Sequence, residues 1–346
     1  MKTRAAVLHT LNRPLSIQEV EMPSPGPGQV LVKVACSGVC HSQLMEVQGK
    51  RGPDRYLPHL LGHEGSGTVL EVGQGVDKIL PGDRVVLTWI KGEGADSGGT
   101  AYCGAQGVVN AGPVTTWSEH AIVSENRCVR LGREMPMDVA ALLGCAVLTG
   151  AGIVLNTMRP KPEESILVWG VGGVGLSAVM GANVCGCKTI IAVDTHENKL
   201  ELARDFGATH LVNAQLEDPR KRIGEIVGPD GVNFAVEAAG LVRTIEMAFE
   251  SVRKRGGLCV FASHPPSGER ISLDPHDLIS GKTIKGSWGG ESIPDRDIPR
   301  FVELYRHGKL PLEKLITGRY GLEDVNQALA DLETGTAGRP VLVMDR

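Results

Sequence analysis

A glycine-rich run that begins at Gly170 constrains the fold of this chain more than any other feature. It follows the apolar segment Ser165–Trp169, which is typical of a buried strand, and it leads into a helical pattern. Strand and helix patterns then alternate through residues 189–262. Such alternation predicts a parallel sheet whose helices form right-handed crossovers. The first third of the chain instead has short strand patterns broken by glycine and proline turns, which predicts an all-β unit.

The glycine run predicts a dinucleotide site. A lone motif of this kind is often an ordinary turn, but here a strand precedes it, a helix follows it, and Asp194 ends the next strand. The helix amino terminus favours phosphate charge, and Asp194 is expected to accept hydrogen bonds from both adenosine ribose hydroxyls. Because a carboxylate repels a 2′-phosphate, NAD is favoured over NADP. The loop residues assigned to the cofactor are Gly170, Gly172, Gly173, Val174 and Gly175.

Three residues far apart in the sequence, Cys40, His63 and Cys145, form a candidate metal site. Zinc prefers thiolate and imidazole ligands, and three protein ligands leave a fourth position open for water or an alcohol oxygen. Buried cysteines that bind nothing are common, so the spacing alone decides little. The local motifs carry the argument: Gly38-Val39-Cys40-His41-Ser42, Gly62-His63-Glu64-Gly65-Ser66-Gly67 and Leu143-Gly144-Cys145-Ala146-Val147-Leu148-Thr149-Gly150.

These motifs, in this order, resemble those of the zinc-dependent medium-chain alcohol dehydrogenases. The resemblance extends from Pro25-Gly26-Pro27-Gly28 to Gly338-Arg339-Pro340. It implies an α/β protein with a GroES-like β-rich catalytic domain (residues 1–146 and 289–346) and a Rossmann doubly wound nucleotide domain (residues 147–288). It further implies one catalytic zinc, NAD(H), and hydride transfer that interconverts an alcohol and an aldehyde or ketone. A homodimer, or a homotetramer, is expected through the segment Gly286-Ser287-Trp288-Gly289-Gly290, which follows Thr283-Ile284-Lys285.

The resemblance also implies roles for single residues. Ser42 would pass on the alcohol proton, and His41 would contact the cofactor pyrophosphate or assist that transfer. Glu64 would be a carboxylate behind the ligands or a transient metal ligand. Lys199 would lie near the ribose and Arg339 would reach the pyrophosphate. From composition alone, Ser42 could equally be a turn residue and His41 a solvent-facing polar residue. Lys199 and Arg339 would more often be solvated surface charges.

The substrate site is the least determined part of the prediction. The resemblance places Trp89 and Trp117 along the substrate cleft, and His264 and Trp288 near the nicotinamide. Large aromatic side chains would narrow the cleft and favour a small, slender or aromatic primary alcohol. The alternative is that these tryptophans simply pack in the protein core.

Three positions depart from the family pattern. Residues 91–112 contain only Cys103 where many relatives have four cysteines, so no structural zinc is expected, and the abundance of glycine predicts a loose loop. Gln43 replaces an aspartate that orients the zinc-binding histidine, although an amide can still bond to the imidazole. Met45 replaces a relay histidine, so the proton would leave through Ser42, a ribose hydroxyl and water.

Composition limits the possible partners and the cellular location of the protein. The chain has 346 residues, a net charge of −4 and eight scattered cysteines, which indicates no nucleic-acid partner and reduced thiols. No apolar stretch of membrane-spanning length and no signal peptide pattern occurs, so a cytoplasmic enzyme without a membrane partner is expected. Two alternatives stay open: a zinc-free quinone or enone reductase on the same fold, and a non-catalytic NAD-binding protein.

Overall fold

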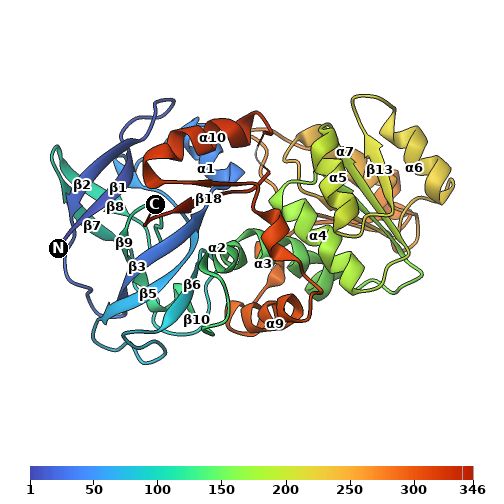
Figure 1. The fold of residues 1–346 in the computed structure, drawn as a ribbon. Coiled ribbons are helices and arrows are strands. Elements are labelled where there is room, and N and C mark those ends of the chain that lie inside the picture. Colours follow the sequence, from blue (N-terminus) through green and yellow to red (C-terminus); the bar gives the residue numbers. More distant parts are fainter. Residues whose placement is uncertain (337, 346) are drawn as a thin grey trace. The chain divides into compact units, whose positions relative to one another are not determined.

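The computed structural model describes residues 1–336 and 338–345, which form two compact units (Figure 1). The first unit comprises Met1–Cys145, Ile293–Glu303 and Leu312–Arg346, apart from the two positions outside the described residues. The second unit comprises Ala146–Ser292 and Leu304–Pro311. Each unit is described by itself below.

The first unit contains a closed barrel and a seven-stranded sheet. Val30, Val32 and Val34 alternate along one strand and are fully buried, because side chains two apart point to the same face. The barrel strands, in spatial order, are β1 (Lys2–Leu8), β2 (Ser16–Glu21), β7 (Thr100–Gly104), β8 (Gly107–Ala111) and β4 (His59–Leu60). The sheet strands are β10 (Cys128–Leu131), β6 (Arg84–Thr88), β5 (Glu64–Val72), β3 (Gln29–Gly38), β18 (Pro340–Val343) and β17 (Gly318–Tyr320), with β9 (His120–Ser124) paired to β3.

The chain's last strand returns to the first unit. Strand β18 pairs with β3, with Val341 opposite Gly38, so Arg339 is placed beside the segment that leads into Cys40. The α-helices around these sheets are α1 (His41–Val47), α2 (Met137–Ala141), α9 (Pro294–Arg306) and α10 (Val325–Glu333).

The loose loop predicted for residues 91–112 is wrong for its second half. Strands β7 and β8 pair as a hairpin from Thr100 opposite Ala111 to Gly104 opposite Gly107. Tyr102 is fully buried in the barrel core, where its hydroxyl oxygen accepts a hydrogen bond from the Ile122 N–H at 2.9 Å. Burial of alternate side chains therefore outweighs the conformational freedom of the surrounding glycines.

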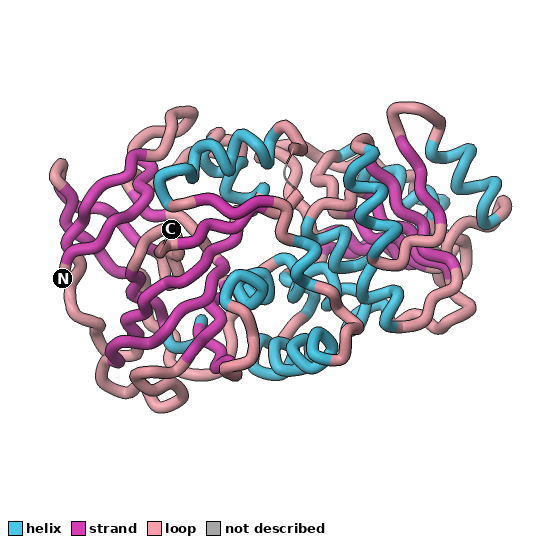
Figure 2. The backbone as a smooth tube through the Cα atoms, in the orientation of Figure 1, coloured by secondary structure: helices cyan, strands magenta, loops and turns pink. Residues whose placement is uncertain are grey.

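The second unit is built on a six-stranded parallel sheet, which confirms the predicted alternation of strands and helices. Helices α4, α5 and α7 pack against the sheet (Figure 2). The strands, in spatial order, are β13 (His210–Asn213), β12 (Thr189–Asp194), β11 (Ser165–Trp169), β14 (Phe234–Glu237), β15 (Leu258–Phe261) and β16 (Thr283–Gly286). The α-helices are α3 (Ala146–Gly152), α4 (Gly173–Val184), α5 (Glu197–Asp205), α6 (Pro219–Val227), α7 (Val242–Ser251) and α8 (Pro275–Ile279).

Strand order reverses between β11 and β14, the strands at the centre of this sheet. In doubly wound folds, ligands bind at the carboxyl ends of the strands that flank such a reversal. The glycine run follows β11 directly, so the fold places it at this point. Leu167, Ile191 and Ala235 are fully buried in the sheet and position the strands beneath it.

No single helix in residues 1–336 and 338–345 combines the length and apolar character needed to span a membrane, although the bent pair Met137–Gly144 and Ala146–Met158 passes by length and composition.

Glycine substitutions in two helices should have opposite effects on stability. A Cβ at Gly175 in α4 would lie 1.9 Å from the Gly170 carbonyl oxygen, so Gly175→Ala should lower the free energy of unfolding by about 1–3 kcal/mol. A Cβ at the exposed Gly224 in α6 meets nothing within 4 Å, so Gly224→Ala should raise it by about 0.5–1 kcal/mol. Urea unfolding of both variants measures the difference. Equal effects would contradict the close packing at Gly175.

Candidate active site

The candidate ligands lie at breaks between elements of the first unit. Cys40 follows β3 after one intervening residue, Val39, and caps α1. His63 lies between β4 and β5, and Cys145 follows the 3-10 helix η2 (Leu142–Gly144). Each side chain is therefore positioned by the end of a regular element rather than by a flexible loop.

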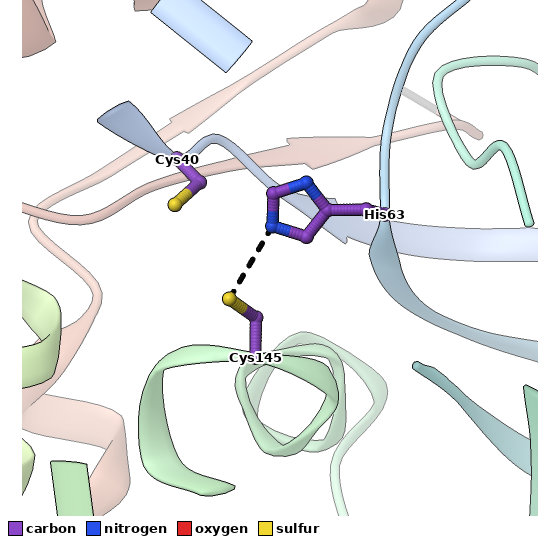
Figure 3. Close-up of side chains that lie close together, drawn as sticks. All are labelled: Cys40, His63 and Cys145. Carbon is purple, nitrogen blue, oxygen red and sulfur yellow. Dashed lines mark hydrogen bonds between the residues drawn. The ribbon is translucent and has the colours of Figure 1, made fainter. Parts of the chain in front are cut away.

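The structure brings Cys40, His63 and Cys145 together. Their donor atoms all lie within 4.8 Å of one another, and Figure 3 shows the three side chains directed at a common point. The His63 Nε2 atom lies 3.3 Å from Cys145 Sγ. Zinc bonds are about 2.0–2.1 Å to nitrogen and about 2.3 Å to sulfur, so small movements would place all three donors around one ion. Two sulfurs and one imidazole nitrogen are a donor set that fits zinc.

The protonation of the three groups is coupled. The hydrogen bond from the Cys145 thiol lowers the pKa of Cys40 well below its ordinary range, although burial acts in the opposite direction. That same bond, with burial, raises the pKa of Cys145 well above its ordinary range. Burial lowers the pKa of His63, but its hydrogen bond with Cys40 and the negative charges of Cys40 and Glu64 together outweigh this, and the net shift is upward. The two thiols shift in opposite directions because they share one hydrogen bond, and a bound cation would favour the thiolate form of both.

A buried ion pair lies behind the ligands. Glu64 is 0% exposed and Arg339 is 4% exposed, and the Arg339 Nη2 group donates to Glu64 Oε1. Burial raises the pKa of Glu64, while the charges of Arg339 and His63 oppose that rise. Gly38 makes room for the carboxylate, since a Cβ there would lie 2.2 Å from Glu64 Oε1. Both roles that the resemblance implies for Glu64, a carboxylate behind the candidate ligands or a transient metal ligand, remain predictions, as does the pyrophosphate contact of Arg339.

Gln43 does not bond to the zinc-site imidazole, contrary to what the sequence suggested for it. The side chain is 1% exposed, and its Oε1 atom accepts a hydrogen bond from the Cys40 N–H at 3.2 Å. Its Nε2 atom is buried without a hydrogen-bond partner. Gln43 therefore orients the first turn of α1 and the Cys40 backbone, because its amide is long enough to fold back on the cap.

The remaining predicted residues are placed as follows. His41 is exposed and Ser42 half-buried in the first turn of α1, directly after the first ligand. Trp117 is fully buried in the first unit's core and donates its indole N–H to the Gly38 carbonyl at 3.3 Å. Trp89 is partly buried against the same core. The substrate contacts predicted for both tryptophans remain predictions.

In the second unit, His264 and Trp288 are exposed, Trp288 to 70%. Lys199 is the third residue of α5. Their predicted contacts with substrate or ribose remain predictions.

The glycine loop has the shape that its sequence predicted. Gly170 has a φ of +81°, a left-handed conformation that favours glycine. Gly172 caps α4, and a Cβ there would meet nothing within 4 Å, so the backbone faces open space at the helix amino terminus. Asp194 lies beside the loop: its Oδ2 accepts from the Val171 N–H at 2.9 Å and its Oδ1 accepts from the Thr195 N–H at 2.8 Å. Backbone groups thus orient the carboxylate before any ligand binds.

Sequence reasoning missed Glu237, which ends β14 next to the strand-order reversal. Its side chain is fully buried, and its Oε1 atom accepts from the Ala239 and Gly240 N–H groups at 2.9 and 2.8 Å. The hydroxyl groups of Thr244 and Ser263 donate to the same carboxylate. Burial raises the pKa of Glu237 despite these bonds. An acidic residue at the end of the apolar run Phe234–Glu237 was the available signal.

Comparison with known proteins identifies the family. Residues 26–133 match the alcohol dehydrogenase GroES-like domain, and residues 173–306 match the zinc-binding dehydrogenase family. The chain is 34% identical to the putative alcohol dehydrogenase D of Mycobacterium tuberculosis strain H37Rv, over 99% of this chain and 100% of that protein. It is also 34% identical to S-(hydroxymethyl)glutathione dehydrogenase of Escherichia coli O6:H1, with the same coverage.

Solved structures agree. Benzyl alcohol dehydrogenase from Acinetobacter calcoaceticus superposes with a TM-score of 0.90 at 33% identity, and a Burkholderia ambifaria alcohol dehydrogenase zinc-binding domain protein superposes with a TM-score of 0.91 at 32% identity. Each match covers 99% of both chains. The chain belongs to the zinc-dependent medium-chain alcohol dehydrogenase family. This confirms the predicted family and its α/β fold of a GroES-like unit and a Rossmann sheet.

Removal of one partner from the buried ion pair should be costly. Arg339→Met leaves the Glu64 carboxylate buried alone, so the free energy of unfolding should fall by about 3–5 kcal/mol. Arg130→Met is the matched control, because Arg130 pairs with Asp83 while 55% exposed, and its loss should cost less than about 1 kcal/mol. Chemical denaturation of the two variants provides the test. Similar costs would show that the Glu64 pair contributes no more than a surface ion pair.

Proposed function

We propose that this alcohol dehydrogenase-type oxidoreductase depends on zinc and on NAD(H), and that it interconverts a primary alcohol and its aldehyde. The observation that carries the proposal is the convergence of Cys40 Sγ, His63 Nε2 and Cys145 Sγ. Three ligands of this type leave a fourth coordination position for the substrate oxygen. When bound, zinc would supply Lewis-acid polarisation of that oxygen, and the nicotinamide would accept or donate the hydride.

The chain's own residues hold the reacting groups. Cys40 and Cys145 supply the negative charge that balances a divalent ion, and the Glu64–Arg339 pair adds no net charge behind them. Ser42, two residues after the first ligand, accepts the alcohol proton and passes it to a ribose hydroxyl and water, since Met45 cannot relay a proton. His41 contacts the cofactor pyrophosphate or assists this transfer.

The cofactor proposal depends on the second unit. The glycine loop receives the pyrophosphate at the amino terminus of α4, with Arg339 as a further contact, and Asp194 accepts hydrogen bonds from the adenosine ribose near Lys199. The Asp194 carboxylate is 9% exposed and already fixed by backbone N–H groups, so it cannot turn away from a 2′-phosphate without losing those bonds. This supports NAD over NADP.

Two further features of the proposal are the substrate and the assembly. Similarity to benzyl alcohol dehydrogenase supports an aromatic or slender primary alcohol, with Trp89, Trp117, His264 and Trp288 as the candidate contacts. Strand β16 forms the edge of its sheet, and three of its four residues are exposed. This unpaired edge supports a homodimer, which is also the unit of a tetramer.

Loss of a sulfur ligand should abolish both zinc binding and turnover. Cys40→Ser should lower kcat/KM for NADH-dependent benzaldehyde reduction at least about 1000-fold, because a hydroxyl is a poor substitute for a thiolate. Cys103→Ser, at an exposed thiol, is the matched control and should retain full zinc content and activity. Elemental analysis and NADH oxidation are measured on the same samples. A zinc-free Cys40→Ser protein with full activity would support the zinc-free reductase instead.

Removal of one negative charge should weaken the choice of cofactor. Asp194→Asn keeps the side-chain size but removes the repulsion of a 2′-phosphate, so the NAD:NADP ratio of kcat/KM should fall by about 10-fold or more. Asp205→Asn, at an exposed position in α5, should leave the ratio unchanged. Initial rates measured with NAD and with NADP give this ratio for both variants. An unchanged ratio in Asp194→Asn would refute the role given to this carboxylate.

A further inference from the structure

A second group of metal-ligating side chains lies in the first unit, outside the cysteine site. It consists of Glu46 in the last turn of α1, Asp54 in the following loop, and His59 at the start of β4. One donor atom from each residue lies within 4.8 Å of the other two. Within the described residues, this is the other group, besides Cys40, His63 and Cys145, whose donors converge in this way.

The two ring nitrogens of His59 face different acceptors. The His59 side chain is 9% exposed, and its Nδ1 atom lies 2.9 Å from the Leu60 carbonyl oxygen. A carbonyl oxygen only accepts, so Nδ1 carries a proton. The other nitrogen, Nε2, lies 2.7 Å from Asp54 Oδ2. With Nδ1 as the donor, Nε2 is the ring nitrogen that would bind a metal ion, and it lies on the Asp54 side of the ring.

The surroundings favour a metal ion. Asp54 Oδ1 accepts from the Tyr56 N–H at 2.8 Å, which directs Oδ2 at the imidazole. Glu46 Oε1 lies 3.9 Å from His59 Nε2 on the same side and supplies a third donor. Glu46 and Asp54 also line a cavity of about 210 Å³, which has room for water molecules to complete the coordination.

We propose that Glu46, Asp54 and His59 bind a second divalent cation, of the zinc, cobalt or manganese type. Two carboxylates balance the charge of such an ion, and the imidazole selects against magnesium and calcium. Neighbouring donors around an ion at about 2.1 Å lie about 3.0–3.4 Å apart. The His59–Asp54 distance would open slightly and the His59–Glu46 distance would close slightly on binding. Arg51, 3.5 Å from Glu46 Oε2, offsets part of the charge and should make this site weaker than the cysteine site.

The position of this site gives it a structural consequence. Glu46 belongs to α1, the helix that starts directly after Cys40, and His59 lies four residues before His63. A cation held here ties together the two segments that carry the first two ligands of the cysteine site. An ion that binds only the folded state also stabilises that state in proportion to the logarithm of its concentration.

Cobalt titration distinguishes the two sites, because only the cysteine site has thiolates. Metal-free full-length protein is titrated with Co²⁺ in equilibrium dialysis, with the thiolate-to-cobalt charge-transfer absorption recorded at each step. The wild type should bind two ions per chain, one with this absorption and a weaker one without it. Asp54→Asn should lose the second ion and keep the first, and Cys145→Ser should lose the absorption and keep the second ion. Asp96→Asn, at an exposed acid paired with Lys91, should keep both.

Binding of one ion per chain by the wild type, or of two ions by Asp54→Asn, would overturn the proposal. Glu46→Gln repeats the test if Asp54→Asn does not fold, because the Glu46 side chain is 28% exposed and tolerates change better. An absent charge-transfer band with an intact second ion would refute the proposed catalytic zinc and leave this site standing.

Discussion

The arrangement of the first unit depends on the buried contact between Glu64 and Arg339. The two residues are 275 positions apart in the chain, and neither is solvated, so each charge requires the other. The pair joins β5, which starts directly after His63, to β18, which pairs with the strand before Cys40. One ion pair therefore links the last strand of the chain to both segments that carry the first two ligands. A neutral pair behind the sulfurs also leaves the charge balance of the site to Cys40 and Cys145.

The two units position their candidate functional residues in different ways. In the first, side chains at the ends of elements converge, and the geometry depends on strands that are distant in sequence. In the second, backbone groups position the candidate cofactor residues: the glycine loop exposes N–H groups at a helix start. Backbone donors also hold Asp194 and Glu237, which end β12 and β14 on either side of β11. A helix amino terminus can bind a phosphate group with backbone N–H groups alone, because the helix dipole and these donors both favour negative charge.

The segments that depart from the family pattern form other hydrogen bonds in this structure. Gln43 bonds to the Cys40 backbone, where an aspartate would bond to the imidazole. Residues 91–99 have no cysteine cluster, but the Glu125 carboxylate links them to another segment. It is 2% exposed and accepts from the Ala95 N–H in this loop and from the N–H groups of Asp77 and Lys78. A carboxylate that accepts several backbone bonds can organise a loop, and these bonds help lower the pKa of Glu125 despite its burial.

The sequence by itself determined the family, the parallel sheet and the glycine loop, because each depends on local patterns: an apolar strand, a turn that only glycine adopts, and motifs around single ligands. It could not show that Gln43 turns back to the Cys40 backbone or that residues 100–111 pair as a hairpin around Tyr102. Nor could it show that Glu237 accepts hydrogen bonds from the loops after β14 and β15. It also gave no sign that Glu46, Asp54 and His59 converge. Only the tertiary structure decided these points. The direction of a side chain and its partners depend on packing between segments, and the number of residues between two segments does not say how far apart they lie in the fold.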